Sequence, residues 1–314
     1  MADLPVDRVT PDRPPFTSVG VDCFGPFLVK RGRTEVKRYG IVFTCLAIRA
    51  IHIEVLHSMD TTSFVNSFRR FIARRGMPEL VRSDNGTNFV AGNKELREAI
   101  NEWNERQVHE FMIQRNIRWI FNPPTASHHG GTWERCIRTI RKILNALIKE
   151  QKLDDESLST LMCEIEAIVN SRPITKASDD PQDLQPLTPN HLLLLRSGSQ
   201  LPPGEFTSDD MYSRRRWRQV QHLANTFWRR WVREYLPQLQ VRQKWVNKSR
   251  NFSVNDIVLL VDERYPRSTW PLGRITEVHV NAQDGCVRSA TVKTGSTVLV
   301  RPITKMVLLE SVQS

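Results

Sequence analysis

Short runs of β-branched and aromatic residues alternate with polar segments at the start of the chain, and the period of the apolar positions then changes. The first three runs are rich in Val, Ile and Phe, as expected of strands, and cover residues 18–24, 39–47 and 50–56. After Asp60 the large apolar residues instead follow a helical spacing, at Phe64, Phe68, Phe71 and Ile72. Gly76 and Pro78 end this pattern. We therefore predict three strands followed by a helix over residues 61–75.

The same two patterns alternate along the next ninety or so residues. Apolar runs predict strands over 79–83 and 117–121, and amphipathic stretches predict helices over 94–115, 132–151 and 154–169. Residues 122–132 are rich in Pro, His and Gly, which is typical of a loop. Three strands followed by alternating helices and strands predict a mixed α/β domain with a central sheet.

The remainder of the chain has a different composition. Residues 176–208 are rich in Pro, Asp and Ser and indicate a linker, and residues 209–248 have a basic helical pattern. Short runs separated by turn signals then indicate a small β-barrel, with strands at 257–261, 273–275, 287–292 and 297–300. We expect a core over 1–175, a linker with a basic helical segment over 176–250, and a β-domain over 251–314.

The basic residues are concentrated in that helical segment. The chain has 45 Lys and Arg against 34 Asp and Glu, but eleven of the cations and a single acid lie between residues 211 and 250. A segment of this charge exceeds what solubility needs and predicts contact with nucleic acid. The segment also carries an apolar stripe at helical spacing, which we expect to pack in a core: Trp217, Val220, Ala224, Phe227 and Trp231.

Several classes of protein are excluded or disfavoured by the sequence. No apolar run approaches the roughly 20 residues that span a bilayer, so we expect no membrane association. The first residues lack the basic and apolar regions of a signal peptide. The five cysteines are scattered and never form a C-x-x-C pair, which argues against a disulfide framework or a Cys-rich zinc site. A reducing compartment fits this pattern best.

Three carboxylates lie at positions that are unusual for acids. Asp22 is inside an apolar strand, where an unpaired buried carboxylate is costly and needs a partner. Asp84 follows a strand and begins an Asp-Asn-Gly sequence, which is also typical of a plain turn. Glu134 lies near the start of a helix, where a carboxylate can be present simply because it interacts favourably with the helix dipole. Together the three could converge on two hard cations that clamp the oxygens of a phosphoryl displacement.

Longer motifs around these acids resemble the catalytic core of retroviral-type integrases. They read VGVDCFGP over residues 19–26, RSDNGTNF over 82–89 and NPPTASHHGGTWER over 122–135. The residues of these motifs are most similar to those of the integrases of BEL/Pao retrotransposons. The C-terminal part also resembles the domain that follows those cores, with FWRRW at 227–231 and WPLGRI at 270–275.

The resemblance implies a fold, a site and an activity. The fold is a ribonuclease-H-like mixed sheet with flanking helices, followed by a helical basic linker and a small SH3-like β-barrel. Asp22 would bridge two Mg²⁺ or Mn²⁺ ions, and Asp84 and Glu134 would each complete one metal site; no zinc is expected. The implied activity is 3′-end processing and strand transfer of element DNA into target DNA. It further implies a homo-oligomer that binds double-stranded DNA in the nucleus, after a cytoplasmic particle stage.

Further residues are candidates for contacts with DNA. Arg138 and Arg141 follow Glu134 by four and seven positions and so share its helix face, although a solvated face is the alternative. His128 and His129 lack a third metal ligand at suitable spacing and fit a loop that contacts substrate. The full set of predicted DNA-binding residues is His128, His129, Arg138, Arg141, Lys142, Arg214, Arg215, Arg216 and Arg218.

Two departures from the integrase pattern keep alternatives open. Fifty positions separate Asp84 from Glu134, which is longer than in the retroviral relatives and predicts that the helix over 94–115 is enlarged and the loop over 122–132 extended. The sequence also lacks the His/His/Cys/Cys zinc module that precedes the core in full-length integrases. An integrase-derived DNA-binding protein, truncated or domesticated and without integration activity, is therefore the main alternative. A simple nuclease is a third possibility, but it would not need the basic segment and the β-domain.

Overall fold

The protein is a mixed α/β molecule with two five-stranded sheets, seen in a computed structural model. The structure describes residues 13–84, 108, 112, 116–122, 133–148, 153–176, 186–195, 216–239, 250–262, 265, 267–281, 285–295 and 297–310. For Asp84 and Glu134 the description covers the backbone. The chain divides into two compact units, residues 1–170 with 206–227 and residues 171–205 with 228–314. The predicted boundaries at residues 175 and 250 stay predictions.

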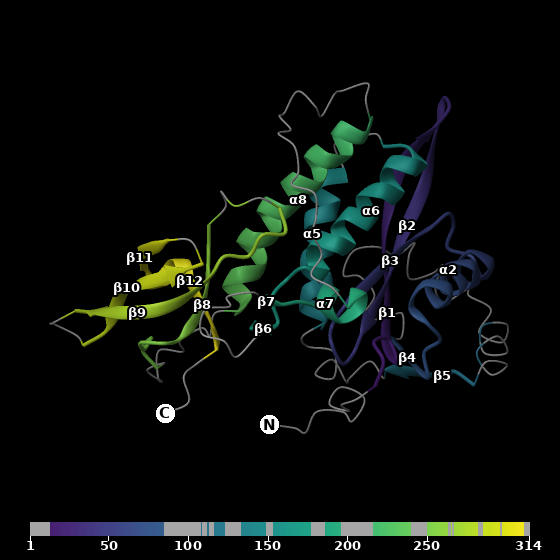
Figure 1. The fold of residues 1–314 in the computed structure, drawn as a ribbon. Helices are drawn as coiled ribbons and strands as arrows, with labels where there is room; N and C mark the ends of the chain where they lie inside the picture. The colour runs from purple at the N-terminus through teal and green to yellow at the C-terminus, as the bar shows by residue number, and fades with distance from the viewer. Residues whose placement is uncertain are drawn as a thin grey trace. The chain divides into compact units, whose positions relative to one another are not determined.

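The sheet of the first unit combines antiparallel and parallel pairing (Figure 1). Its strands are β1 (Ser18–Arg31), β2 (Thr34–Cys45), β3 (Ile51–Leu56), β4 (Leu80–Asp84) and β5 (Arg118–Asn122). The order across the sheet is β3-β2-β1-β4-β5. The first three strands pair antiparallel, whereas β4 is parallel to β1 and β5 is parallel to β4. The predicted strands are thus present, and β1 is longer than expected at its C-terminal end.

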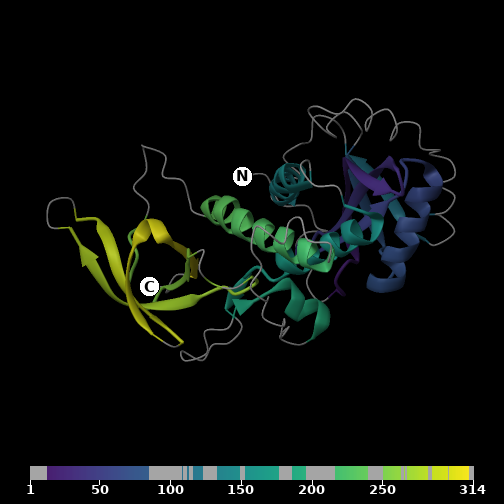
Figure 2. The same ribbon diagram turned by 90° about the horizontal axis from the view of Figure 1, so that it is seen from above.

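Helices cover both faces of this sheet, with α2 on one side and α5 and α6 on the other, as Figures 1 and 2 show. They are α2 (Thr61–Arg75), α5 (Trp133–Ile148) and α6 (Asp155–Asn170). α2 and α6 pack against β3, and α5 packs against β1. The predicted bounds of α2 are confirmed, because Asp60 caps its N-terminus by accepting from the Ser63 amide at 2.6 Å and Gly76 ends it with a φ of 90°.

Phenylalanines form much of the core between α2 and the sheet. The rings of Phe43 on β2 and Phe71 on α2 stack with their centroids 4.3 Å apart. Phe64 and Phe68 of α2 are fully buried, as the helical spacing predicted, whereas Ile72 is only partly buried. The large apolar residues of α2 therefore fix which face of the helix meets the sheet.

The second unit is built around an antiparallel sheet of order β11-β10-β9-β8-β12. Its strands are β8 (Ile257–Leu260), β9 (Leu272–Val280), β10 (Val287–Thr294), β11 (Val298–Pro302) and β12 (Met306–Glu310). Their buried side chains include Val258, Ile275, Val292 and Met306. The sequence patterns missed β12, because only the single 3₁₀ turn η3 (Ile303–Lys305) separates it from β11. β6 (Thr175–Lys176) and β7 (Pro186–Leu187) form a two-stranded sheet, followed by α7 (Pro189–Leu194).

The basic helical segment forms α8 (Arg216–Leu239). Four residues of its predicted apolar stripe are buried, namely Val220, Ala224, Phe227 and Trp231. The fifth assignment is wrong: Trp217 is 57% exposed. It lies in the first turn of the helix, where the Arg218 guanidinium is 5.7 Å from its ring centroid. No helix among the described residues is long and apolar enough to cross a membrane. The predicted helix over 94–115 and loop over 122–132 lie almost entirely outside the described residues.

Candidate active site

Asp22 lies in the middle of β1, next to the parallel half of the first sheet. Its neighbours in sequence, Val21 and Cys23, are buried, whereas the Asp22 side chain is 15% exposed. β1 pairs with β2 on one side and with β4 on the other. A carboxylate here is held by a rigid strand and is only slightly open to solvent.

The backbone brings Asp84 to the same level of the sheet as Asp22. Val21 is registered with Ser83 in the parallel β1–β4 pair, so the next residue of each strand is Asp22 and Asp84. Neighbouring strands in a sheet are about 4.8 Å apart. Asp84 is also the last residue of β4, so it stands at the carboxyl end of a parallel strand. Two acids that are 62 positions apart in sequence are thereby adjacent in the sheet.

Glu134 is the second residue of α5, the helix that packs against β1. It precedes Arg141 by seven residues, which is two helical turns, so the two positions share one face of α5. The Arg141 guanidinium contacts β1 at Asp22 itself. The face of α5 that carries Glu134 is therefore the face turned toward the strand of Asp22.

Arg141 is bound to β1 through two acceptors. One guanidinium nitrogen forms an ion pair with Asp22 Oδ1 and donates to the Cys23 carbonyl oxygen at 2.8 Å. The Arg141 Nε atom is buried and has no hydrogen-bond partner among the side chains and backbone groups that the structure describes. Burial, with a further contribution from Asp22, raises the pKa of the Cys23 thiol, so this cysteine stays protonated and is not a nucleophile.

The remaining predicted DNA-binding residues lie on two helices or outside the described residues. Arg138 and Lys142 are exposed on α5, and Arg216 is exposed on α8, where it pairs with Asp154. Arg218 covers the Trp217 ring. The other four, His128, His129, Arg214 and Arg215, lie outside the described residues.

Among the residues whose side chains the structure describes, no cluster of three His, Cys, Asp or Glu groups could hold a metal ion. That search does not include the side chains of Asp84 and Glu134. Carboxylate oxygens are the ligands that Mg²⁺ and Mn²⁺ prefer, and Asp22 already attracts a cation, the Arg141 guanidinium. Carboxylates at Asp22, Asp84 and Glu134 would suit hard divalent cations by their donor chemistry.

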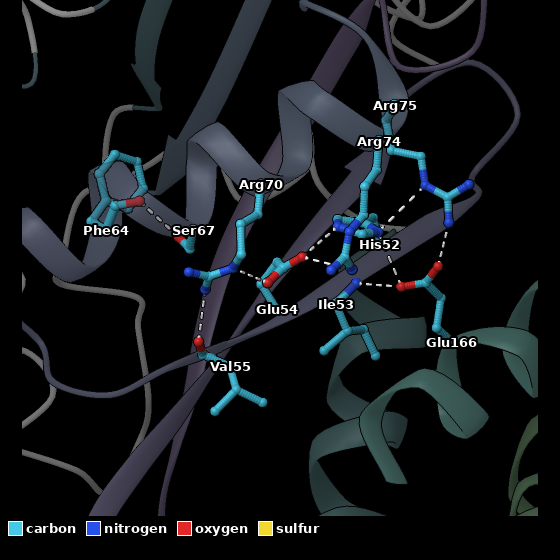
Figure 3. A network of polar contacts seen from close by, with 10 residues as sticks. All are labelled: His52, Ile53, Glu54, Val55, Phe64, Ser67, Arg70, Arg74, Arg75 and Glu166. Carbon is cyan, nitrogen blue, oxygen red and sulfur yellow. Dashed lines mark hydrogen bonds and ion pairs between the residues drawn. The ribbon is translucent and has the colours of Figure 1, made fainter. Parts of the chain in front are cut away.

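A buried network of charged side chains, which the sequence patterns did not predict, joins α2, β3 and α6 (Figure 3). His52 of β3 lies between two carboxylates, with Nε2 at 3.1 Å from Glu54 and Nδ1 at 3.2 Å from Glu166. Arg70 Nε donates to Glu54 at 2.6 Å, and Arg75 pairs with Glu166. Glu54 and His52 alternate with apolar residues in β3, a weak signal that both point to one face.

The carboxylates favour the charged form of His52. Burial alone would lower the pKa of His52, but hydrogen bonds to Glu166 and Glu54 outweigh it and raise the pKa above its usual value. Burial likewise would raise the pKa of both glutamates, yet the bonds to His52 and the arginines lower it. The Arg75 Nε atom is also 3.4 Å from His52 Nδ1, but a protonated Nδ1 cannot accept. Arg75 therefore pairs with Glu166, while its charge opposes the rise in the pKa of His52.

Comparison with known proteins gives one match to a family model and similarities to solved structures. The model of a family of unknown function, DUF5641, matches residues 215–309. No curated protein matches the chain. A chain of a solved structure, described as the cryo-EM structure of the simian T-cell lymphotropic virus intasome in complex with PP2A regulatory subunit B56 gamma, is similar at 11% identity and a TM-score of 0.38. That similarity covers 100% of this chain and 85% of the other. A likeness of this degree does not identify an activity, so the function is argued from the residues of the site.

Proposed function

We propose that the protein is a metal-dependent DNA strand transferase of the integrase type, similar to those of BEL/Pao retrotransposons. One observation carries the proposal: Asp22 and Asp84 stand at the same level of adjacent parallel strands, and Glu134 is the second residue of the helix that packs against β1. Acids at the carboxyl ends and centres of parallel strands are positioned by the sheet rather than by loops. This is the arrangement that a carboxylate site for two cations needs.

The sheet order supports a ribonuclease-H-like catalytic unit. Three antiparallel strands are followed by two strands parallel to β1, with helices on both faces. The integrase-like motifs place their acids on β1, at the end of β4 and at the start of α5. The antiparallel sheet β8–β12 is proposed as the SH3-like DNA-binding domain of the same type of protein.

The site residues have separate roles in the proposed chemistry. Asp22, Asp84 and Glu134 would hold two Mg²⁺ or Mn²⁺ ions, which lower the pKa of the attacking hydroxyl or water and stabilise the leaving oxygen. β1 and β4 fix the two aspartates on a rigid sheet, and α5 fixes the glutamate. In end processing, water attacks a phosphorus atom and the bond to the 3′-oxygen breaks. The freed 3′-hydroxyl then attacks a phosphorus atom of the target DNA, and the bond from that phosphorus to the target's own 3′-oxygen breaks. No covalent bond to the protein forms in either step.

The proposed partners follow from charge. The segment over residues 211–250 carries a net charge of +10, which suits a phosphate backbone. Arg138 and Lys142 are exposed on the same helix as Glu134 and could contact DNA near the cut. We include homo-oligomerisation and a nuclear location in the proposal, since joining two DNA ends to a chromosomal target requires both.

Two DNA substrates test the proposal. The purified chain is incubated with Mn²⁺ and either a branched DNA, which reports the reverse reaction called disintegration, or a pair of element ends. We expect disintegration, because the pre-joined substrate supplies by itself the proximity that assembly otherwise provides. Activity on neither substrate, from a folded chain that still binds DNA, would favour the non-catalytic alternative.

A further inference from the structure

Arg141 is paired with Asp22, the carboxylate on which the proposed metal site depends most. Its guanidinium pairs with Asp22 Oδ1, and the two side chains keep only 21% and 15% of their exposure. Glu134 lies two turns earlier on the same face of α5. A cation on the protein itself thus neutralises Asp22 when no metal is bound.

The pairing leaves Arg141 incompletely satisfied. Its guanidinium carries five N–H donors, yet Nε is buried without a partner, and one terminal nitrogen serves both Asp22 and the Cys23 carbonyl. A buried donor without an acceptor costs free energy. A bidentate acceptor such as a phosphate, approached through Nε and a terminal nitrogen, would satisfy this edge of the guanidinium.

A guanidinium and a divalent cation compete for the same carboxylate oxygen. Both are positive, and at ion-pair distance in a site this buried the repulsion between them is strong. If Asp22 binds a metal ion, Arg141 must leave Oδ1. The side chain is long enough to move without its helix, and DNA phosphates are the anions that the proposed reaction brings to this site.

Resting on the proposed function, we propose that Arg141 is a counter-ion switch. It pairs with Asp22 in the metal-free protein, is displaced when the metal site is loaded, and then binds a DNA phosphate. Arg141 is thus a positioning residue that couples metal loading to DNA contact. Because such coupling is reciprocal, phosphate binding by Arg141 also favours metal binding at Asp22.

Calorimetric titration of the full chain with MnCl₂, in the absence of DNA, tests the competition. Removing the competing cation in Arg141→Gln should tighten Mn²⁺ binding about five- to tenfold, a factor that corresponds to about 1–1.4 kcal/mol. Arg141→Lys keeps a competing charge and should stay close to wild type. The matched control is Arg38→Gln, which breaks an Arg–Asp pair with Asp155 in the same unit and should leave Mn²⁺ affinity unchanged.

The outcomes separate the switch from the proposed function. Unchanged or weaker Mn²⁺ binding by a folded Arg141→Gln overturns the switch and leaves the metal site standing. Failure of both wild type and Arg141→Gln to bind Mn²⁺ overturns the metal site, and the switch with it.

The salt dependence of DNA binding tests the second half of the switch without any metal. Asp22→Asn should release Arg141, so the slope of log K against log salt should steepen by about 0.9, the value of one phosphate contact. The double variant Asp22→Asn with Arg141→Gln should return to the wild-type slope. Asp155→Asn makes the same change in charge beside Arg38, whose side chain is buried, and should not steepen the slope. Equal slopes for wild type and Asp22→Asn would overturn the release of Arg141.

Discussion

At the scale of single residues, two groups of charged side chains with little exposure in the first unit differ in kind. One is the pair of Asp22 and Arg141, which lies at the candidate active site. The other is the network around His52, in which every carboxylate accepts from at least two donors. A buried charge is tolerated only when it is paired and hydrogen-bonded. The network therefore has a structural role, whereas the pair at Asp22 leaves a buried donor without an acceptor.

The His52 network should give the first unit a characteristic pH dependence. The pKa of His52 is raised by folding, so its contribution to stability is full below about pH 6.5, its unfolded value, and is lost as the pH rises through the folded value. The glutamate pKa values are lowered, so their contribution is full above about pH 4.5 and is lost as the pH falls. We expect the network to stabilise most between these two limits.

Denaturant unfolding between pH 5 and pH 9 measures this dependence. His52→Gln should cost about 3 kcal/mol near pH 6, because it leaves two carboxylates short of a partner, and the loss should shrink at higher pH. His57→Gln, which changes an exposed histidine one residue beyond the same strand, should leave the pH dependence unchanged. A variant His52→Gln that loses stability equally at every pH would contradict a charged His52.

The network also shows what a sequence does not reveal at this scale. His52 and Glu166 are more than a hundred positions apart, and nothing in either neighbourhood predicts their contact. The position of Asp22 inside an apolar strand did signal an ionic partner, but the sequence suggested a metal ion. The structure shows that Arg141, selected only as a candidate DNA contact, pairs with Asp22.

At the scale of elements, local sequence signals correctly predicted the ends of a helix where a cap or a turn sets them. Asp60 and Gly76 delimit α2 where the sequence places them, because a cap hydrogen bond and a positive φ are local events. β12 was missed because its pairing with β8 is not local and only a short 3₁₀ turn precedes it. The prediction that Trp217 is buried was wrong for a related reason. Helical spacing predicts which residues share a face of a helix, but not which part of that face other elements cover.

Two of the three tryptophans of α8, Trp217 and Trp231, make a matched test of that difference. Trp231 is fully buried and stacks on Tyr235 with centroids 4.6 Å apart, whereas Trp217 is exposed. Trp231→Ala should destabilise the protein by about 3–5 kcal/mol, and Trp217→Ala by no more than about 0.5 kcal/mol. Thermal and denaturant unfolding of both variants measure this difference. Comparable losses would show that the N-terminal turn of α8 packs in a core after all.

At the scale of the whole molecule, the net positive charge is concentrated in one segment of the chain. The chain carries a net charge of +11, and residues 211–250 account for nearly all of it. The acids of the candidate site lie on β1, β4 and α5, well separated from that segment in sequence. We therefore expect most of the DNA affinity to reside in the basic segment and the chemistry on β1, β4 and α5, with Arg141 coupling the two.

DNA affinity should therefore depend on the basic segment more than on other exposed cations. Changing Arg214, Arg215 and Arg216 together to Gln should flatten the slope of log K against log salt by up to about 2.7, the value of three phosphate contacts. A control with the same loss of charge changes Arg31, Arg33 and Lys37, which are exposed around the turn between β1 and β2. If both triple variants flatten the slope equally, DNA binding follows net charge and not the basic segment.

The central claim is that Asp22, Asp84 and Glu134 act together on phosphodiester bonds, and Mn²⁺-dependent disintegration of a branched DNA measures it most directly. We predict that Asp22→Asn, Asp84→Asn and Glu134→Gln each lower the rate by about 10³-fold in a folded chain, because losing one carboxylate removes a principal electrostatic stabiliser. Glu156→Gln, which changes an exposed acid in the first turn of α6, should keep the wild-type rate. A folded variant of any of the three acids with the wild-type rate would contradict the account.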